Sequence, residues 1–400
     1  MSEWIKAEEY CVSVFDGTHD TPKVTETGYK LVTSKNILSN TLDLNSAYYI
    51  SEEDFVNINK RSKVKQYDIL FSMIGTVGSL YFETSDTIDY AIKNIGVFSC
   101  GNKEKAEWLY YYLQSSYAQK YIKRYLNGAV QKFLPLKGLR EFPVPQFNKE
   151  LHNRIKILLN IDQKIQTNNQ INQELEAMAK TLYDYWFVQF DFPDQNGKPY
   201  KSSGGKMVYH PELKREIPEE WGVEKLGDIT ICHDSKRVPL SSNDRELVKG
   251  EIPYYGATGI MDYVNDYIFD GDYVLMAEDG SVMTEKGTPI LQRISGKNWV
   301  NNHAHVLEPI NNHSCKLLMM LLKDVSVMKI KTGSIQMKIN QENMNKIVVP
   351  AIPLELLFEI NQKLEVIDKQ QLNLIEENKQ LTQLRDWLLP MLMNGQVKVE

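Results

Sequence analysis

The chain has 400 residues, of which 42% are hydrophobic and 24% charged, as expected for a folded protein with two or three domains. Its net charge of −6 argues against an unspecific coat on DNA but leaves sequence-specific binding open, since that depends on where the charge lies. No run of about 18 apolar residues is long enough to span a membrane, and the polar start MSEWIKAEEY is not a secretory signal, so we expect a cytoplasmic protein.

The cysteines stand alone in the sequence, with no CxxC spacing. They are Cys11, Cys100, Cys232 and Cys315. Buried free thiols in a reducing compartment are the simplest interpretation. We therefore expect neither a disulfide framework nor a metal site.

Residues 1–147 have the pattern of a mixed α/β domain, in which short strand-like runs alternate with turns. These runs are Tyr29–Val32, Asp68–Met73 and Ile92–Cys100. A helix is predicted from Lys103 to Tyr125, ended by Gly128, since glycine commonly ends helices. Its apolar face consists of Trp108, Leu109, Tyr112, Leu113 and Tyr121.

A long helix is predicted within residues 148–190, from about Asn148 to Phe187, after the proline-bounded segment PVPQF. Its apolar residues recur at steps of three and four, which indicates a narrow helical stripe. They are Leu151, Ile155, Leu158, Ile161, Ile165, Ile171, Leu175, Met178 and Leu182. At about 1.5 Å per residue such a helix is a rod of roughly 60 Å. Residues 191–218 are rich in Pro, Gly, Ser and Lys without periodicity, which predicts a linker or crossing loop.

The second half of the chain repeats the first, so that residues 219–352 correspond to the first domain and residues 353–400 to the first long helix. Asp68-Ile69-Leu70 matches Asp272-Tyr273-Val274, and Gly75-Thr76-Val77 matches Gly280-Ser281-Val282. The second helix carries the same stripe, at Ile360, Leu364, Ile367, Leu374, Leu381, Leu384 and Leu388. The predicted fold class is therefore α+β, a tandem pseudo-symmetric repeat of two mixed α/β domains joined by two long helices.

Catalytic motifs are absent from the sequence. There is no GxGxxG after a strand and no GxxxxGK[ST] to cradle nucleotide phosphates. There is also no Pro-Pro pair of the kind with which amino-methyltransferases hold an adenine, and no acidic cluster for nuclease metals. We expect no catalytic residue in this chain.

Three histidine segments resemble metal sites in part. His303-Ala304-His305 has a spacing that points two imidazoles to one face of a strand, but no clear third ligand follows. The alternative is a strand whose alternate residues point one way, with a nucleic-acid contact. His19-Asp20 and His233-Asp234 are interpreted as polar loops.

Basic residues recur at the same repeat positions of otherwise neutral or acidic domains. In the first domain they are Lys60, Arg61, Lys63 and Lys65, and around Gly128 they are Lys120, Lys123, Arg124, Lys132, Lys137 and Arg140. Around Gly333 they are Lys323, Lys329, Lys331 and Lys338. Such residues either contact phosphates or are solvated helix ends, and both interpretations stay open. The loop Ile252–Gly259 is likewise a base-edge contact or a plain turn.

Several stretches resemble the DNA-specificity subunit of type I restriction–modification systems. The central region of that family is similar to Leu182–Phe187, Asp191–Pro193, Gly197–Gly205 and Arg215–Pro218 before Glu220-Trp221. Asp16–Pro22 resembles an opening of the family's target recognition domains, and Ile252–Gly259 and Asn301–Val306 resemble that of another type. The resemblance covers essentially the whole chain.

The resemblance implies that each domain is a target recognition domain reading one half of a bipartite DNA sequence. It implies that the two helices form an antiparallel coiled coil that sets the unread spacer. The stripe residues expected in this coiled coil or against partners are Ile155, Leu158, Ile165, Leu175, Leu182, Ile360, Ile367, Leu381 and Leu388. Amides interrupt the stripe at Asn168, Asn169, Asn172, Gln371 and Asn378, either buried, where they fix register, or exposed.

DNA contacts are expected from polar and basic residues of both domains, by hydrogen bonds to base edges and phosphates. In the first domain the candidates are Thr18, His19, Lys35, Lys60, Arg61, Lys63, Lys65, Gln131 and Lys132. In the second they are Tyr255, Thr258, Asn302, His303, Gln336 and Lys338.

The family resemblance further implies two methylation subunits and two restriction (motor-nuclease) subunits as partners, besides double-stranded DNA. S-adenosylmethionine, ATP and magnesium would be bound by those partners, with no cofactor on this chain. Two alternatives remain at this stage. One is the specificity subunit of a related type II restriction–methylation enzyme, and the other is a coiled-coil scaffold that joins proteins rather than DNA.

Overall fold

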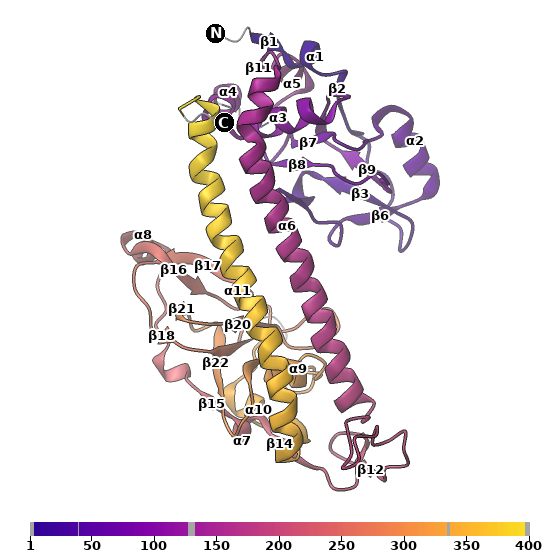
Figure 1. Cartoon of the computed structure of the whole chain (residues 1–400), viewed down its shortest axis with the longest axis vertical. Coiled ribbons are helices and arrows are strands. Elements are labelled where there is room, and N and C mark those ends of the chain that lie inside the picture. Colours follow the sequence, from indigo (N-terminus) through magenta and orange to yellow (C-terminus); the bar gives the residue numbers. More distant parts are fainter. Residues whose placement is uncertain (1–3, 39, 127–132, 334–336, 397–400) are drawn as a thin grey trace. The chain divides into compact units, whose positions relative to one another are not determined.

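The computed structural model describes residues 4–38, 40–126, 133–333 and 337–396 (Figure 1). It divides into two compact units. One consists of Met1–Gln166 with Lys379–Glu400, and the other of Thr167–Asn378. Each unit therefore holds one α/β domain and a part of both long helices. No helix among the described residues is long and apolar enough to cross a membrane.

The first unit is built on an antiparallel sheet of order β2-β10-β7-β8. Its strands are β2 (Ser13–Asp16), β10 (Ile95–Ser99), β7 (Ile69–Ser72) and β8 (Leu80–Phe82). A second sheet has the order β6-β3-β9, from β6 (Tyr48–Ile50), β3 (Tyr29–Thr33) and β9 (Tyr90–Lys93). Two strand pairs complete the sheets, β1 (Trp4–Lys6) with β11 (Pro143–Pro145) and β4 (Ile37–Leu38) with β5 (Thr41–Leu42). The short helices are α1 (Ala7–Tyr10), η1 (Ser34–Asn36), α2 (Glu52–Ser62), α3 (Lys103–Gln114), α4 (Ser116–Leu126) and α5 (Leu136–Arg140).

The second unit repeats the main sheet in the order β15-β22-β19-β20, again antiparallel throughout. Its strands are β15 (Thr230–Cys232), β22 (Ala304–Pro309), β19 (Tyr273–Ala277) and β20 (Leu291–Ile294). The second sheet is β17 (Ile260–Val264), β16 (Lys249–Tyr255), β21 (Lys297–Val300) and β18 (Phe269–Asp270). Two pairs remain, β12 (Met207–His210) with β13 (Arg215–Pro218) and β14 (Gly222–Lys225) with β23 (Val348–Ala351). The short helices are η2 (Asp184–Val188), α7 (Leu226–Ile229), η3 (Asp234–Lys236), α8 (Ser242–Leu247), α9 (Cys315–Leu322) and α10 (Gln341–Asn345).

Backbone geometry agrees with the duplication seen in the sequence. Gly75 follows β7 with a φ of 76°, and its counterpart Gly280 follows β19 with a φ of 73°. Both are left-handed conformations that residues with a Cβ rarely adopt. The same turn thus leaves the same strand of both main sheets.

The long helices are α6 (Lys149–Tyr183) and α11 (Leu354–Met393), and they run antiparallel where they meet within each unit. In the second unit Asn168 contacts Asn378 and Asn172 contacts Gln371, so residue numbers increase along α6 as they decrease along α11. In the first unit Asp162 of α6 contacts Arg385 of α11.

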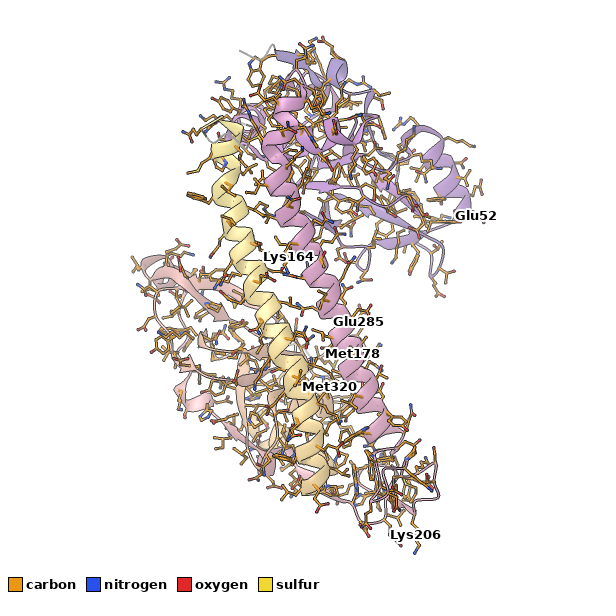
Figure 2. All side chains as sticks on the ribbon, viewed as in Figure 1. Glu52, Lys164, Met178, Lys206, Glu285 and Met320 are labelled. Carbon is orange, nitrogen blue, oxygen red and sulfur yellow. The ribbon has the colours of Figure 1, made fainter. Side chains whose placement is uncertain are left out.

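The predicted stripe packs into the core of whichever unit it lies in. Ile155, Leu158 and Ile360 are fully buried. Leu175, Ile367 and Leu388 are more than nine-tenths buried. Ile165, Leu182 and Leu381 are half-buried against the same cores. The stripe prediction is wrong for three of its members, because Ile171 (37%), Met178 (58%) and Leu384 (42%) are exposed; Figure 2 labels Met178 on α6.

The amides that interrupt the stripe have different environments. Asn168 is fully buried, and its Nδ2 donates to Glu377 Oε2 at 2.7 Å and to Asn378 Oδ1 at 2.9 Å. Gln371 and Asn378 are half-buried, and Asn172 is too, whereas Asn169 is exposed. Since a buried directional contact at one point of an apolar seam favours a single register, Asn168 is the residue that fits that role.

A carboxylate at the same repeat position joins each domain to its helices. In the first unit Asp162 of α6 accepts a hydrogen bond from Tyr111 Oη of α3 at 2.5 Å and one from Arg385 Nη1 of α11 at 3.0 Å. In the second unit its counterpart Asp368 of α11 accepts from Arg293 Nη2 of β20 at 3.0 Å. The two equivalent aspartates therefore bind different partners, Tyr111 and Arg385 in the first unit and Arg293 in the second; we call this aspartate the anchor.

Four sequence predictions need correction. The helix predicted from Lys103 to Tyr125 is two helices, because Ser115 is extended and its hydroxyl caps α4. The strand predicted over Ile92–Cys100 is β9 and β10, separated by Asn94 at a φ of 54°. The predicted linker 191–218 contains the hairpin β12–β13, and α6 ends at Tyr183, beyond which the π-helix η2 continues. Gly128 lies outside the described residues.

Asp368 and Asp272 provide a matched test of the anchor, because both pair with Arg293 but differ in exposure. The Asp368 side chain is 14% exposed and that of Asp272 is 60% exposed. We expect Asp368→Ala to lower the free energy of unfolding by about 2 kcal/mol, since it leaves a mostly buried guanidinium with only the exposed Asp272 as its carboxylate partner. Asp272→Ala should cost about 0.5 kcal/mol or less, because exposed ion pairs contribute little. Urea denaturation followed by circular dichroism measures both, and equal losses would contradict the anchor.

Candidate nucleic-acid interface

In the first domain, candidate contact residues gather where the chain leaves β2 and enters β10. Thr18 forms an isolated bridge with Lys93, and His19 Nδ1 lies 2.8 Å from Asn94 Oδ1. His19 Nε2 lies 3.0 Å from Asp16 Oδ2, so both ring nitrogens are engaged. The ring is therefore held across the turn that precedes β10.

Basic residues adjoin this turn. Arg61 Nη2 donates to the carbonyl of Gly17 at 3.2 Å, and Ser34 Oγ, next to the exposed Lys35, donates to the carbonyl of Asn94 at 3.2 Å. Beyond α2 the chain exposes Lys63 and Lys65 in alternation with two buried residues, and Lys60 is exposed at the end of the helix. Thr18, His19 and Arg61 thus come together, and Lys35 adjoins them through its neighbour Ser34, whereas Lys63 and Lys65 are exposed without a described contact to this turn.

In the second domain, five candidates lie at neighbouring turns. They are Tyr255, Thr258, Asn302, His303 and Lys338. The carbonyl of Tyr255 accepts from Asn301 N at 3.0 Å, and Asn301 Oδ1 accepts from His303 N at 2.8 Å. Thr258 stands in the tight turn closed by Gly256 N and Gly259 O at 2.8 Å. These contacts place the end of β16 beside the turn that precedes β22.

Two neighbouring acidic residues, Asp279 and Glu278, contact His303 and Lys338. His303 Nδ1 lies 2.5 Å from Asp279 Oδ1, and Lys338 Nζ lies 2.9 Å from Glu278 Oε1. Asp279 and Lys338 also form an isolated backbone bridge. Gln131, Lys132 and Gln336 lie outside the described residues, so these candidates stay predictions.

Beneath the second group lies a network of charged side chains that the sequence did not reveal. Arg237 Nη1 donates to Glu278 Oε2 at 2.6 Å, and Arg237 Nη2 lies 3.2 Å from Asp234 Oδ2. His305 Nδ1 lies 2.5 Å from Asp234 Oδ2, and its Nε2 lies 2.8 Å from the carbonyl oxygen of Ile339. Asp234, for which the sequence predicted a polar loop together with His233, begins η3 and belongs to this network.

The network determines the charge state of its carboxyl groups. Burial raises the pKa of Asp234, but the hydrogen bond and charge of His305, with Cys232 and Arg237, outweigh it and hold that pKa below its usual range. Burial likewise raises the pKa of Glu278, and hydrogen bonds from Arg237 and Lys338 outweigh it and lower it. Both groups are therefore carboxylates at neutral pH.

The same place in the first domain is apolar. Val97 of β10 pairs with Leu70 of β7, as Leu307 of β22 pairs with Val274 of β19. Two residues before these positions stand Ile95 in the first domain and His305 in the second. Ile95 belongs to an apolar cluster and is fully buried. The same sheet order therefore carries an apolar residue in one domain and a charged network in the other, near the start of the same interior strand.

Cys232, Asp234 and His305 bring three possible metal-ligand atoms within 4.8 Å of one another. However, both nitrogens of His305 face oxygen acceptors, so each carries a proton and neither offers a lone pair. Asp234 is also paired with Arg237. The group thus fits an ion-pair network, and the two imidazoles of His303 and His305 do not converge, since each turns to a different aspartate.

The cysteines are free, as expected, but two of them are not isolated in space. The Sγ atoms of Cys11 and Cys100 lie 3.7 Å apart in the buried interior of the first domain. The hydrogen bond with Cys100, together with burial, raises the pKa of the Cys11 thiol far above its usual range. Such a thiol is a poor nucleophile.

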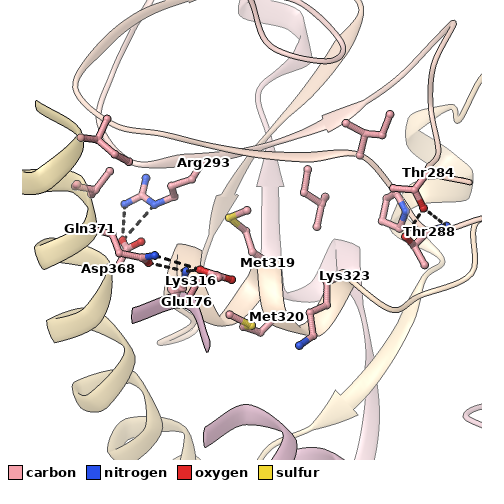
Figure 3. Close-up of a pocket in the computed structure, with 15 residues that line it drawn as sticks. Glu176, Thr284, Thr288, Arg293, Lys316, Met319, Met320, Lys323, Asp368 and Gln371 are labelled. Carbon is pink, nitrogen blue, oxygen red and sulfur yellow. Dashed lines mark hydrogen bonds and ion pairs between the residues drawn. The ribbon is translucent and has the colours of Figure 1, made fainter. Parts of the chain in front are cut away.

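A cavity of about 550 Å³ lies in the second unit, where the domain meets the helices (Figure 3). Lys316 pairs there with Glu176 and donates to Gln371 Oε1 at 2.8 Å, and Met319 and Met320 supply apolar wall. Lys323, which also lines the cavity, has an aromatic counterpart in the first unit. Tyr111 stands nine positions after the N-cap residue of α3, and Lys323 stands nine positions after that of α9. Tyr111 reaches Asp162, whereas Lys323 lies 3.6 Å from Asp184.

Comparison with known proteins assigns this architecture. A protein-family model described as "Type I restriction modification DNA specificity domain" matches the chain twice, over residues 20–177 and 218–383. The chain belongs to this family. Two DNA specificity domains in one chain make a bipartite recognition subunit.

The curated relatives are specificity subunits, and their matches with this chain range from 151 to 411 residues. A putative type I restriction enzyme specificity subunit of Haemophilus influenzae is 34% identical over 151 residues, which is 37% of either chain. The MjaIX specificity subunit of Methanocaldococcus jannaschii is 25% identical over 319 residues, 74% of this chain and 70% of that one. The HindI specificity subunit of H. influenzae is 23% identical over 411 residues, 84% of this chain and 88% of that one.

A solved structure shares the fold. The crystal structure of a type I restriction–modification S subunit from M. genitalium matches with a TM-score of 0.51 at 16% identity, over 98% of this chain and 96% of that one. In this specificity-subunit frame, Thr18, His19 and Arg61 lie at the turn that precedes β10, and Tyr255, Asn302 and His303 lie at the turn that precedes β22.

Arg237 tests the network of the second domain. Its side chain is 10% exposed, and Arg237→Gln leaves two buried carboxylates without their guanidinium, so we expect a loss of about 3 kcal/mol at pH 7. The pKa values of Asp234 and Glu278 are lowered in the folded state. Their pairing therefore stabilises fully above about pH 4.5 and is lost as the pH falls through the folded values.

The difference between wild type and Arg237→Gln should accordingly shrink between about pH 5 and pH 3 in urea denaturation. Lys249→Gln is the control, since Lys249 is 46% exposed in its pair with Asp262 and should change stability by about 0.5 kcal/mol or less. A loss in Arg237→Gln that stays constant over this pH range would contradict the assignment.

Proposed function

We propose that this specificity subunit acts in the cytoplasm as the sequence reader of a complex that methylates adenine and cleaves DNA. Each domain reads one half-site, and the two helices set the length of the unread spacer. The observation that carries the proposal is the shared sheet frame with different edges, in which His305 and its charged network replace the apolar Ile95. A conserved frame with divergent edges is what reading two different half-sites requires.

Partner subunits supply the chemistry in this proposal. Two methylation subunits and two motor-nuclease subunits assemble on the chain and carry S-adenosylmethionine, ATP and magnesium. Apolar side chains that stay exposed on the long helices support a docking role for them, because such residues gain most by burial against another protein. On α6 they include Met178 (58%), and on α11 Phe358 (62%), Ile375 (59%) and Trp387 (60%).

Exchange of the second domain tests the independence of the half-sites. Replacing residues 219–352 with the matching segment of a specificity subunit of different specificity should alter one half-site and leave the other unchanged. The main sheet of the second unit closes within this segment, so the exchange keeps its hydrogen-bond ladder intact. Selection of bound duplexes from a randomised pool by the assembled complex gives the readout. A change in both half-sites would sink the two-domain proposal.

Insertion of one heptad into both long helices tests their role as a ruler. Seven residues placed after Gln166 of α6 and seven before Lys379 of α11 lengthen the antiparallel pair by about 10 Å and preserve the apolar phase. We expect the half-sites to persist and the preferred spacer to lengthen by about three base pairs at roughly 3.4 Å each. Seven Gly and Ser residues inserted at Asn196, in a surface turn, are the control and should leave the spacer unchanged. An unchanged spacer in the heptad variant would show that the helices do not measure it.

A further inference from the structure

We propose that His303 reads a base edge in the half-site of the second domain, with Nε2 as the contacting atom and Asp279 as the residue that positions the ring. The inference rests on the proposed function in one respect, namely that the second domain reads DNA. It adds the residue, the atom and the chemical class of base.

The main chain of His303 is held on both sides. Its N–H donates to Asn301 Oδ1 at 2.8 Å, and its carbonyl accepts from Glu278 N at 2.8 Å. Asn301 is itself buried, with 3% of its surface exposed. The residue therefore sits on a fixed backbone although it belongs to a turn.

One nitrogen of the ring is fixed and the other is available. Nδ1 lies 2.5 Å from Asp279 Oδ1, and because a carboxylate only accepts, Nδ1 carries the hydrogen. No hydrogen bond joins Nε2 to any residue within the described parts of the chain, and the side chain is 44% exposed. A ring that is held at one nitrogen and open at the other is preorganised for a single directional contact.

His19 of the first domain provides the contrast. Its Nδ1 and Nε2 are both engaged, with Asn94 and Asp16, although its side chain is 60% exposed. Exposure alone would favour His19 as a base contact, whereas the hydrogen bonds favour His303. The two histidines predicted as DNA contacts thus have different roles, and His19 holds a turn.

The protonated Nδ1 determines which bases His303 accepts. In the neutral ring Nε2 is an acceptor, and in the major groove the donors are the N6 amino group of adenine and the N4 amino group of cytosine. Guanine presents N7 and O6 there, both acceptors, which Nε2 does not complement. In the neutral form that we propose, His303 therefore selects a base with an amino group at its position, whereas a doubly protonated ring would present a donor to guanine.

The charges around His303 permit the approach of DNA. The carboxylates of Asp234 and Glu278 are compensated by Arg237 and by the doubly protonated His305. Lys338 Nζ lies at the surface, 49% exposed, within 2.9 Å of Glu278. A lysine at this place suits a phosphate, which positions a duplex without carrying sequence information.

The test compares His303→Ala with Lys338→Ala in the assembled complex, by selection from a pool of duplexes randomised across both half-sites. His303→Ala should lower the preference for adenine or cytosine at one position of the second half-site by roughly 2- to 12-fold, the range of one net hydrogen bond. All other positions should keep their preferences. Lys338→Ala should weaken binding evenly across sequences and reduce its salt dependence.

Asp279 is tested as a positioning residue. Asp279→Ala should relax the same position as His303→Ala, and Asp279→Glu, which keeps a carboxylate, should restore part of the preference. A role in folding alone would not change the preference at one position, and circular dichroism of each variant checks the fold.

The outcomes separate this inference from the proposed function. Absence of two selected half-sites with the wild-type chain would overturn the proposed function. Two half-sites with the wild type, unchanged in His303→Ala, would overturn only the inference about His303. A preference for guanine at the position that His303→Ala relaxes would likewise overturn it.

Discussion

A carboxylate at one repeat position ties each domain to the long helices, and the arrangement of each unit depends on it. An apolar stripe on a helix is compatible with several axial positions of the domain packed against it, whereas a directional ion pair admits few. Asp162 joins α3, α6 and α11 through Tyr111 and Arg385, and Asp368 joins α11 to β20 through Arg293. The equivalence of the two aspartates explains how one duplicated helix supports two domains whose facing residues differ.

The main sheets of the two domains likewise combine a common frame with different side chains. Both main sheets have one strand order and the same left-handed glycine turn. Near the start of the same interior strand the first domain packs Ile95 into an apolar cluster, and the second pairs His305 with Asp234. At this position the two domains therefore differ between an apolar interior and a fully paired polar one. A specificity subunit needs this separation, because its two domains must differ in what they read while keeping one frame.

Sequence patterns predicted those parts of the structure that depend on local periodicity or on the repeat. The apolar stripes gave both long helices, and the matched segments gave the common turn at Gly75 and Gly280. The break at Ser115 was missed because the apolar face continues across it, and the hairpin β12–β13 was missed because its short strands lack alternation. The local periodicity of apolar residues does not indicate a helix break of this kind or strands this short.

Contacts between distant residues were beyond the reach of the sequence. Arg237 and Glu278 are separated by 41 positions and have no counterpart in the first domain, so the repeat offered no signal for them. Tertiary pairing also separates His19 from His303, which the sequence predicted alike as DNA contacts. The signal that distinguishes them is which ring nitrogens are engaged, and only the folded chain shows it.

Methylome mapping of adenines in cells that carry this chain with its partner subunits tests the central claim most directly. The account predicts methylation at one bipartite sequence, with two defined half-sites separated by a spacer of fixed length and any composition. Methylation at a single continuous sequence, or at half-sites whose separation varies, would contradict it.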